Sequence, residues 1–429
     1  MKGLRRRHLA VARQGCYRLR MRDFLFENRH WLGFGFLLTF ASAFGQTWFI
    51  SLFAGDIKDR FGLTDGGWGL VYTVATLAAA GLLLTRGGLA DTVRPDRLAP
   101  LMALAFAVAA VAFALAPVLW ALIPALVALR FCGQGMFSHL AMTAMGRWFR
   151  ARRGRAVSIA NLGHSAGEMV LPVVAVLLIA WLGWQATWLV VAAVLVLAVA
   201  PALARLGRER VAQSADSFVE APGVGGRHWT RADALRHWLF PALLPILLTP
   251  GFIGTVVFFH QVHVSEVKGW TLAQMAPGYG VFAALSVASA LVAGWAADRF
   301  GPHRLLPLLL VPTGLGVALI GPAESVAAWF VALGLIGMTQ GLSASLWGAF
   351  WPAVYGTRHL GSVRALATTV MVVSTAIGPG LTGLLIDAGV DFPAQGLGLG
   401  LWCAALSLLA LWLHARPMLA ALRPQGGTA

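Results

Sequence analysis

Three ionisable side chains stand deep inside stretches of otherwise apolar sequence, and their types can bind protons or anions. Arg130 lies nine residues into its stretch, about 13–14 Å at the rise of a helix. Glu168 is the one acidic residue deep in any apolar stretch, and His164 precedes it by four residues on the same helix face. Because ionisable groups in such surroundings are costly, they are usually functional. We expect the chemistry of the protein to lie here.

Arg130 and Glu168 reach similar depths from opposite ends of neighbouring stretches, so the sequence allows an ion pair between them. One hypothesis makes Glu168 the carrier of a coupling proton, with His164 sharing the role because imidazole titrates near neutral pH. The alternatives are a purely structural pair or neither role. His139, His164 and Glu168 have the side-chain types of a metal site, but His139 is nine residues from Arg130 and points to the opposite face. We therefore expect no metal.

The elements that position these residues follow from composition. The chain has 429 residues, of which 58% are apolar and 12% charged, and its mean hydropathy is +0.74. These values exclude a soluble enzyme, a disordered chain and a fibre. Three distant cysteines form no disulfide framework. Membrane helices need about 20 apolar residues, and twelve stretches qualify: 31–54, 67–88, 98–119, 121–146, 155–181, 183–205, 237–262, 274–297, 303–321, 325–354, 361–386 and 393–416.

The net charge of +16 suggests a nucleic-acid partner until the basic residues are sorted by loop. Of the 33 lysines and arginines, 29 fall in the two terminal segments and the loops on one side of the twelve stretches. Positive loops mark the cytoplasmic side. We therefore predict a multi-pass protein of a bacterial inner membrane with both termini in the cytoplasm, and no nucleic-acid binding.

Two stretches repeat each other, Gly87–Arg97 and Gly294–Arg304, at an offset of 207 residues. An offset of this size predicts a tandem duplication of six helices, as in transporters whose site lies between the halves. The basic first thirty residues have no signal-peptide core, and translation from Met21 is an alternative interpretation. The predicted organisation is a basic arm 1–30, a bundle 31–205, a linker 206–236, a bundle 237–416 and a tail 417–429.

These motifs resemble the major facilitator superfamily over the whole length. The Gly294–Arg304 copy is similar to the family's loop motif, whereas the first copy departs from it with Thr92 and Arg94. RFCGQG from Arg130 resembles the family's helix-4 arginine motif, and Arg147–Ala156 resembles the monocarboxylate-porter branch. The resemblance implies an all-α membrane fold of 12 helices in two pseudo-symmetric six-helix bundles.

The resemblance also implies a cytoplasmic gate, in which carboxylates at helix ends meet arginines of neighbouring helices when the outside is open and separate when it closes. A carboxylate at such a position can accept from free N–H groups of a helix N-terminus. The alternative is charge that only sets topology. The gate residues expected are Asp91, Arg153, Arg155, Asp298, Arg299 and Arg364.

Family resemblance further places the cavity among helices 1, 4, 7 and 10. His260, with His263 and Glu266, stands at the outer end of helix 7, as a solvated mouth or as a sensor of protons or substrate. Besides Arg130, His164 and Glu168, the residues expected at the substrate or coupling site are Gln46, Thr47, Tyr72, Gln134, His260, Tyr279, Gln340 and Trp347.

The resembling branch has a helix-8 arginine where this chain has Ala290. We therefore expect a small, mostly apolar solute with at most one negative charge, taken up with protons. The alternatives are efflux of amphipathic drugs by proton antiport, and a transporter-like receptor or assembly factor that moves nothing. Nucleotide-binding and catalytic motifs are absent from the sequence. We expect no enzyme activity, no cofactor and a monomer whose partners are substrate, protons and lipid.

Overall fold

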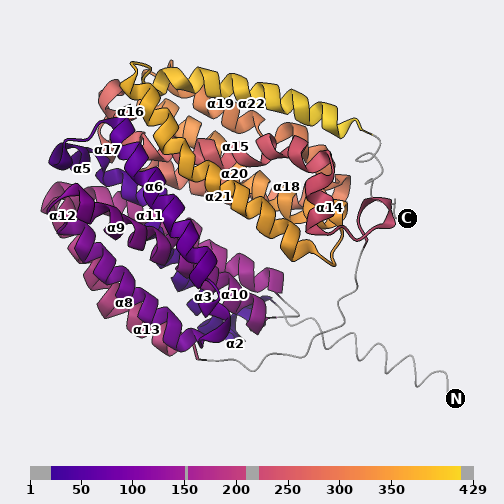
Figure 1. Ribbon diagram of the computed structural model, residues 1–429, viewed down its shortest axis with the longest axis horizontal. Coiled ribbons are helices and arrows are strands. Elements are labelled where there is room, and N and C mark those ends of the chain that lie inside the picture. Colours follow the sequence, from indigo (N-terminus) through magenta and orange to yellow (C-terminus); the bar gives the residue numbers. More distant parts are fainter. Residues whose placement is uncertain (1–20, 150–152, 209–221, 417–429) are drawn as a thin grey trace.

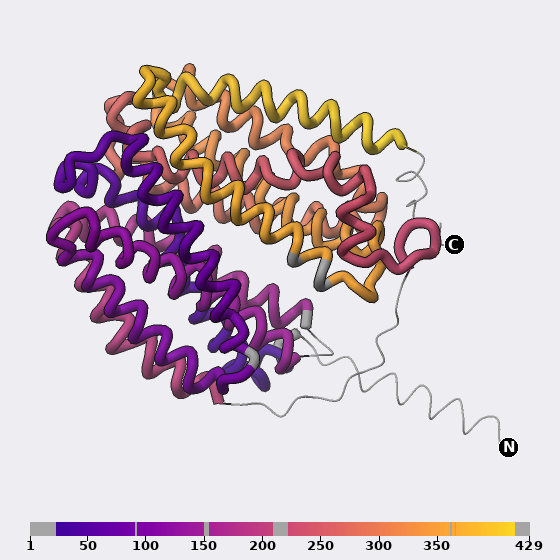
Figure 2. Tube along the Cα trace, viewed as in Figure 1, coloured from indigo at the N-terminus to yellow at the C-terminus, as the bar shows by residue number. Residues whose placement is uncertain are grey.

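The computed structural model describes residues 21–149, 153–208 and 222–416, and within them the chain is helical. Eleven of its helices are long and apolar enough to cross a membrane, and a bent pair, Arg29–Gly45 with Thr47–Phe61, supplies a twelfth span. The predicted all-α fold with twelve membrane spans is therefore confirmed. The two halves form two bundles, coloured indigo to magenta and red to yellow in Figures 1 and 2.

The described residues of the N-terminal half form sixteen helical elements, several of which join into one span. They are α2 (Met21–Glu27), α3 (Arg29–Ala41), η1 (Ser42–Gly45), α4 (Thr47–Ile50), η2 (Ser51–Phe53), α5 (Ala54–Phe61), α6 (Asp65–Arg86), α7 (Leu89–Thr92), α8 (Pro95–Ala114), α9 (Leu119–Arg130), η3 (Phe131–Phe137), α10 (Ser138–Trp148), α11 (Arg153–Leu182), α12 (Trp184–Val194), η4 (Leu195–Val199) and α13 (Ala200–Leu206).

The C-terminal half begins with two short elements and continues with six spans. Its elements are η5 (Val224–Gly226), α14 (Arg231–Arg236), α15 (Leu239–Phe259), α16 (Gln261–Lys268), α17 (Leu272–Met275), α18 (Gly278–Phe300), η6 (Pro302–Leu308), α19 (Val311–Ile320), α20 (Val326–Tyr355), α21 (Leu360–Asp387) and α22 (Phe392–His414).

The first span is bent, whereas the sequence predicts one helix over 31–54. Gln46 has an extended backbone, with φ −82° and ψ 154°, and the two parts of the span meet at 45°. The bend lies where this span packs closely against helix 4, the span that consists of α9, η3 and α10. A Cβ at Gly45 would lie 2.6 Å from the carbonyl oxygen of Leu129 and 2.8 Å from the Cα of Gly133. The bend brings Gln46 and Thr47 toward the centre of the molecule.

An aromatic cluster holds the part of span 1 beyond the bend. The ring of Trp188 in α12 lies 5.5 Å from Phe49, 5.1 Å from Phe53 and 5.0 Å from Phe113. All four side chains are almost fully buried. Aromatic pairs at such distances add stability beyond the area they bury, so this segment has a firm support inside its own bundle.

The halves meet along two helix pairs, α6 with α21 and α11 with α18. We call the end of the molecule with α5, α16 and α17 the far end, and the end with α2, α14 and the last turn of α22 the terminal end (Figure 1). Near the far end a Cβ at Gly69 would lie 2.8 Å from the carbonyl carbon of Pro379. The backbones of α6 and α21 therefore touch there.

Candidate functional site

A cavity of about 630 Å³ lies between the halves. Its floor toward the far end includes Trp48 and Phe258, and its lining reaches Arg364 in the first turns of α21, an exposed residue at the terminal end. The full lining is Gln46, Thr47, Trp48, Gln134, His164, Glu168, Leu247, Pro250, Gly251, Gly254, Thr255, Phe258, Phe282, Ile336, Gln340, Ser343, Ala344, Trp347, Gly348, Trp351, Arg364, Ala367, Thr368, Met371 and Thr375.

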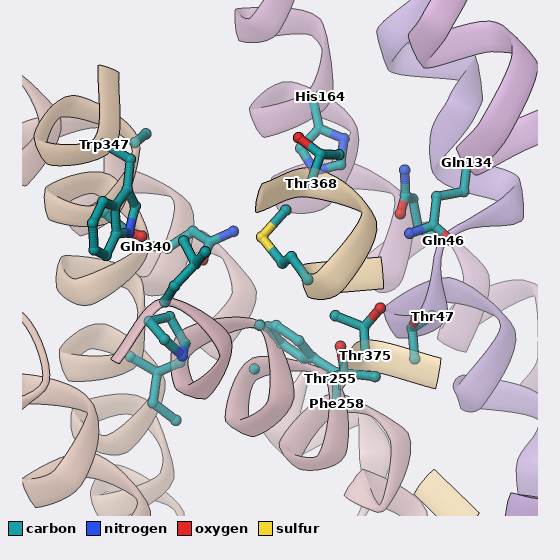
Figure 3. A pocket seen from close by; sticks show the side chains of 18 of the residues that line it. Gln46, Thr47, Gln134, His164, Thr255, Phe258, Gln340, Trp347, Thr368 and Thr375 are labelled. Atoms are coloured by element: carbon teal, nitrogen blue, oxygen red, sulfur yellow. The ribbon is translucent and has the colours of Figure 1, made fainter. Parts of the chain in front are cut away.

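Many of the predicted site residues share this cavity. Gln46, Thr47 and Gln134 come from the bent first span and from η3, and they lie on one side in Figure 3. Gln340 and Trp347 of α20 lie on the opposite side. His164 and Glu168 of α11 complete the set. The lining thus combines neutral amides and hydroxyls with apolar walls.

Glu168 faces the cavity without a partner. Its side chain is 7% exposed, and it forms no hydrogen bond or ion pair with any residue that the structure describes. Close packing of α11 against α3 fixes its position, since a Cβ at neighbouring Gly167 would lie 3.1 Å from the carbonyl oxygen of Phe40. A carboxyl group held in this way can accept and release a proton through the cavity alone.

Arg130 does not form the ion pair with Glu168 that the sequence allows. Its Nη1 donates to the carbonyl oxygen of Gly45 at 2.9 Å and to Thr47 Oγ1 at 3.4 Å. The guanidinium lies 5.0 Å from the ring centre of Tyr72, whose hydroxyl donates to Thr47 Oγ1 at 2.8 Å. The physical reason is the bend of span 1, because it presents a backbone carbonyl to Arg130 and sets Thr47 between the guanidinium and the cavity. Arg130 and Tyr72 therefore lie behind the cavity wall.

His260 and Tyr279 belong to the closed far end and not to the cavity lining. The His260 Nε2 lies 2.8 Å from Thr382 Oγ1, within the C-terminal half. The Tyr279 hydroxyl bridges the halves, with Trp48 O at 3.2 Å and Gln261 Oε1 at 2.8 Å. The ring of Tyr279 also stacks on Phe258 at 5.1 Å. Tyr279 thus lies directly beneath the cavity floor.

Further hydrogen bonds close the same end. Ser51 Oγ donates to the carbonyl oxygen of Phe258 at 2.7 Å, and Gln261 Nε2 donates to Ser51 Oγ at 2.9 Å. Both bonds join η2 of the first span to α15 and α16 of the C-terminal half, and the side chains of Ser51 and Gln261 are buried. Buried polar groups that find partners in this way tie two surfaces together, because separating them leaves the groups unpaired.

Two carboxylates that the sequence analysis did not single out complete the closure. Asp387, the last residue of α21, accepts from Thr64 Oγ1 at 2.8 Å and from the Gly66 amide at 3.2 Å, at the N-terminus of α6. Asp65 lies 3.0 Å from Lys58 Nζ in its own half and 3.4 Å from His263 Nδ1 across the interface. The signal available beforehand was only that both acids stand at helix ends beside the membrane.

Three of the residues predicted for a gate at the terminal end can be followed in the described part of the chain, and they are not paired across the halves there. Asp298, Arg155 and Arg299 are exposed, and none forms an ion pair with a described residue. Arg299 instead lies 5.8 Å from the Trp295 ring of its own helix. The side chains of Asp91 and Arg153 lie outside the described residues. The gating role of this set stays a prediction.

Comparison with known proteins adds the family. The profile of the Major Facilitator Superfamily matches residues 35–379 and 278–427. Monocarboxylate transporter 11 of Mus musculus is 30% identical over 274 residues, which cover 60% of this chain and 58% of the relative. The protein of the same name from Homo sapiens is 29% identical, over 60% of this chain and 55% of the relative. The chain thus aligns with little more than half of each.

The fold resembles two crystal structures of a bacterial homologue of the human lysosomal transporter Spinster. Its inward-facing, unoccupied conformation has a TM-score of 0.64 at 17% identity and covers 92% of this chain and 95% of that one. The inward-facing, occupied conformation has a TM-score of 0.62 at 16% identity, over 95% and 99%. With a family profile spanning nearly the whole chain, this multi-pass membrane protein belongs to the Major Facilitator Superfamily of transporters.

Proposed function

We propose that the protein is a proton-coupled secondary transporter that takes up a small, mostly apolar organic solute with at most one negative charge, by alternating access. The observation that carries the proposal is the cavity between the halves. It is sealed at the far end and reaches the terminal end, and it holds Glu168, which has no hydrogen bond or ion pair with a described residue. Such a cavity is accessible from one side at a time, as alternating access requires.

The cavity chemistry supports the substrate class. Its walls are largely aromatic and aliphatic, and its polar groups are mostly neutral amides and hydroxyls. Among the described residues of the lining Arg364 is the one lysine or arginine, which favours a solute with a single negative charge over one with two. The relatives named monocarboxylate transporter 11 agree with a solute of one carboxylate.

The excess of arginine at the terminal end supports a cytoplasmic location for both termini, in the inner membrane of a bacterium. In this orientation the cavity opens to the cytoplasm, and solute would be released there. Protonation of Glu168 would neutralise the one carboxylate among the described residues of the lining. A proton bound together with a singly charged anion would leave the net charge of the site unchanged.

Proteoliposomes test the proposal with short aliphatic and aromatic monocarboxylates. The intact protein should exchange labelled solute in counterflow, and an inward proton gradient should drive its accumulation. Glu168→Gln should keep counterflow and lose proton-driven accumulation, whereas Glu324→Gln, an exposed acid in the loop before α20, should keep both. Solute leaving against the proton gradient would show antiport instead, and binding without exchange would indicate a receptor.

A further inference from the structure

Four polar side chains on the cavity wall of the N-terminal half have no hydrogen bond or ion pair with any residue that the structure describes. They are Gln46, Gln134, His164 and Glu168, and all four line the cavity. Gln46 and Glu168 are more than nine-tenths buried. Their polar atoms stay accessible from the cavity, unlike the sealed indole N–H of Trp48. Because buried polar groups are normally paired, this wall indicates a site that a solute or water fills.

Close backbone packing holds the two amides next to each other. A Cβ at Gly45 would lie 3.0 Å from the backbone nitrogen of Gln134, and a Cβ at Gly133 would lie 2.6 Å from the Cα of Gly45. Gln134 belongs to the π-helical segment η3, and Gln46 has the extended backbone of the bend. Such irregular segments are frequent at functional sites. Figure 3 shows both amide groups at the cavity, where they can offer four N–H donors to a solute.

The helix that carries Glu168 packs against the same segment. A Cβ at Gly167 would lie 3.1 Å from the Cβ of Ala43, which belongs to η1 just before the bend. Helix α11 also contacts α4, which begins directly after Gln46. Glu168 and the two amides therefore border the same part of the cavity, and His164 lies one turn away from Glu168 on α11.

A buried positive charge lies behind this wall. Arg130 is 2% exposed, donates to the neutral groups Gly45 O and Thr47 Oγ1, and forms no ion pair with an acidic residue of the described chain. A buried charge without a counter-ion is costly. A negative charge on the cavity side of Thr47 reduces this cost, whether Glu168 or a bound anion carries it.

We propose that Gln46, Gln134 and protonated Glu168 form a carboxylate subsite, so that the anion binds only together with a proton. The amide N–H groups and the O–H of protonated Glu168 donate to the carboxylate of the solute, whereas ionised Glu168 repels it. The proton comes from water in the cavity. Glu168 carries the negative charge of the empty site, and the solute carries that of the loaded site. This inference rests on the proposed function for its substrate class and names the residues that bind the anion and the proton.

Other groups around Glu168 can also carry charge or bind protons. On α11 and the elements around the cavity they are His164, Arg130, Tyr72, Tyr279 and Arg364. Nε2 of His139 on α10 lies instead beside α6, 3.7 Å from the position of a Cβ at Gly87. Since His164 shares the wall with Glu168, it is the competing acceptor of the proton, and its variant separates the two.

Binding of benzoate and of neutral benzamide to the purified full chain tests the subsite, by isothermal titration from about pH 6 to about pH 9. Uptake of one proton with each anion makes benzoate affinity fall by up to about tenfold per pH unit once Glu168 of the empty site ionises. Benzamide carries no charge and should not show this fall. Glu168→Gln keeps a donor at this position, so it should bind benzoate without pH dependence and, at about pH 9, more tightly than the parent.

Variants of the two amides test the donors. Gln134→Met and Gln46→Met keep the length of the side chain and remove its N–H groups. Each should weaken benzoate binding at about pH 6 by about tenfold or more, the usual effect of losing a hydrogen bond to a charged group. Gln185→Met is the control, because the amide of Gln185 donates to the carbonyl oxygen of Ala114 outside the lining. Circular dichroism and gel filtration of each variant establish that the folded protein is being compared.

The subsite and transport fail separately. Three results overturn the subsite: no benzoate binding by the intact protein, benzoate affinity that stays constant over the pH range, or equal binding by Gln134→Met and Gln185→Met. Proton uptake that persists in Glu168→Gln and disappears in His164→Gln also overturns it. Proton-linked binding in the predicted order without counterflow in proteoliposomes supports the subsite and overturns transport. Proton-driven accumulation that both amide variants leave unchanged, with unchanged benzoate binding, supports transport and overturns the subsite.

Discussion

The two ends of the molecule are closed and opened by different kinds of chemistry. At the far end, hydroxyls, amides and carboxylates bind backbone groups of the opposite half, as Ser51 does with Phe258 and Asp387 with Gly66. At the terminal end the charged groups Arg155, Asp298 and Arg299 are exposed on their own halves. The far end therefore closes by short contacts between the halves, whereas these charged groups of the terminal end are exposed.

The comparison indicates that close helix packing contributes more to closing an end of the molecule than the number of charged residues there does. Arginines cluster at the terminal end, which the sequence predicts to be the cytoplasmic side. At the far end the helices of the two halves approach until backbones touch, as α6 and α21 do at Gly69 and Pro379. Its stability as a closed surface depends on a few glycines and buried hydrogen bonds, and single substitutions there should have the largest effects.

The largest effect is expected from Gly69→Val. The new side chain would meet the backbone of Pro379 on α21, because even a Cβ at this position would lie 2.8 Å from the Pro379 carbonyl carbon. Overpacking of this kind costs about 1–3 kcal/mol, and here it opposes closure of the far end. Counterflow should fall about tenfold or more. Gly81→Val, on the same helix but with no atom within 4 Å of its Cβ, should retain counterflow. Equal loss in both variants would place the defect in the helix and not in the contact.

A smaller effect is expected from Asp387→Asn. The amide keeps an acceptor for Thr64 but loses the charge at the N-terminus of α6, a change of about 1 kcal/mol. Opening of the far end should become easier, and spin labels at D59C and V267C, on exposed positions of α5 and α16, should report longer distances. Asp391→Asn is the control, since Asp391 caps α22 within its own half through the Ala394 amide. Unchanged label distances in Asp387→Asn would show that this contact does not hold the end closed.

Most of the fold was predictable because the membrane imposes length and polarity on each helix. The twelve stretches and the fold class follow from local sequence, and the structure confirms them. Gly183, with φ 80°, separates the stretches 155–181 and 183–205. The bend at Gln46 was not predictable, because its cause is contact of Gly45 with helix 4. Between helices 3 and 4 the prolines Pro117 and Pro124 predict a break; Pro117 lies in it, at 115–118, whereas Pro124 lies inside α9.

The sequence predicts how deep each site residue lies along its helix, but not which neighbouring helix its side chain faces. Counting residues along a helix places Arg130 and Glu168 near the middle of the molecule, as the structure does. Such counting does not show which side of helix 4 faces the bend of helix 1. Arg130 lies on that side, and it therefore donates to the carbonyl oxygen of Gly45 and does not pair with Glu168. The far-end contacts were missed for a related reason: bonds from side chains to distant backbone groups, such as Ser51 to Phe258, leave no pattern in the sequence.

Asp298→Asn should have the smallest effect on the stability of the folded protein. It tests most directly whether charges at the terminal end act in transport. Asp298 is exposed and has no ion-pair partner among the described residues, so the thermal melting of the protein in this conformation should not change. Turnover should nevertheless fall, because the predicted role of Asp298 is to meet a cation or a helix N-terminus of the opposite bundle when the terminal end closes. Melting in detergent and counterflow rates separate the two quantities. A variant that melts and transports like the parent would mean that charge at this end serves topology alone, and that the far end by itself controls which side of the membrane the cavity faces.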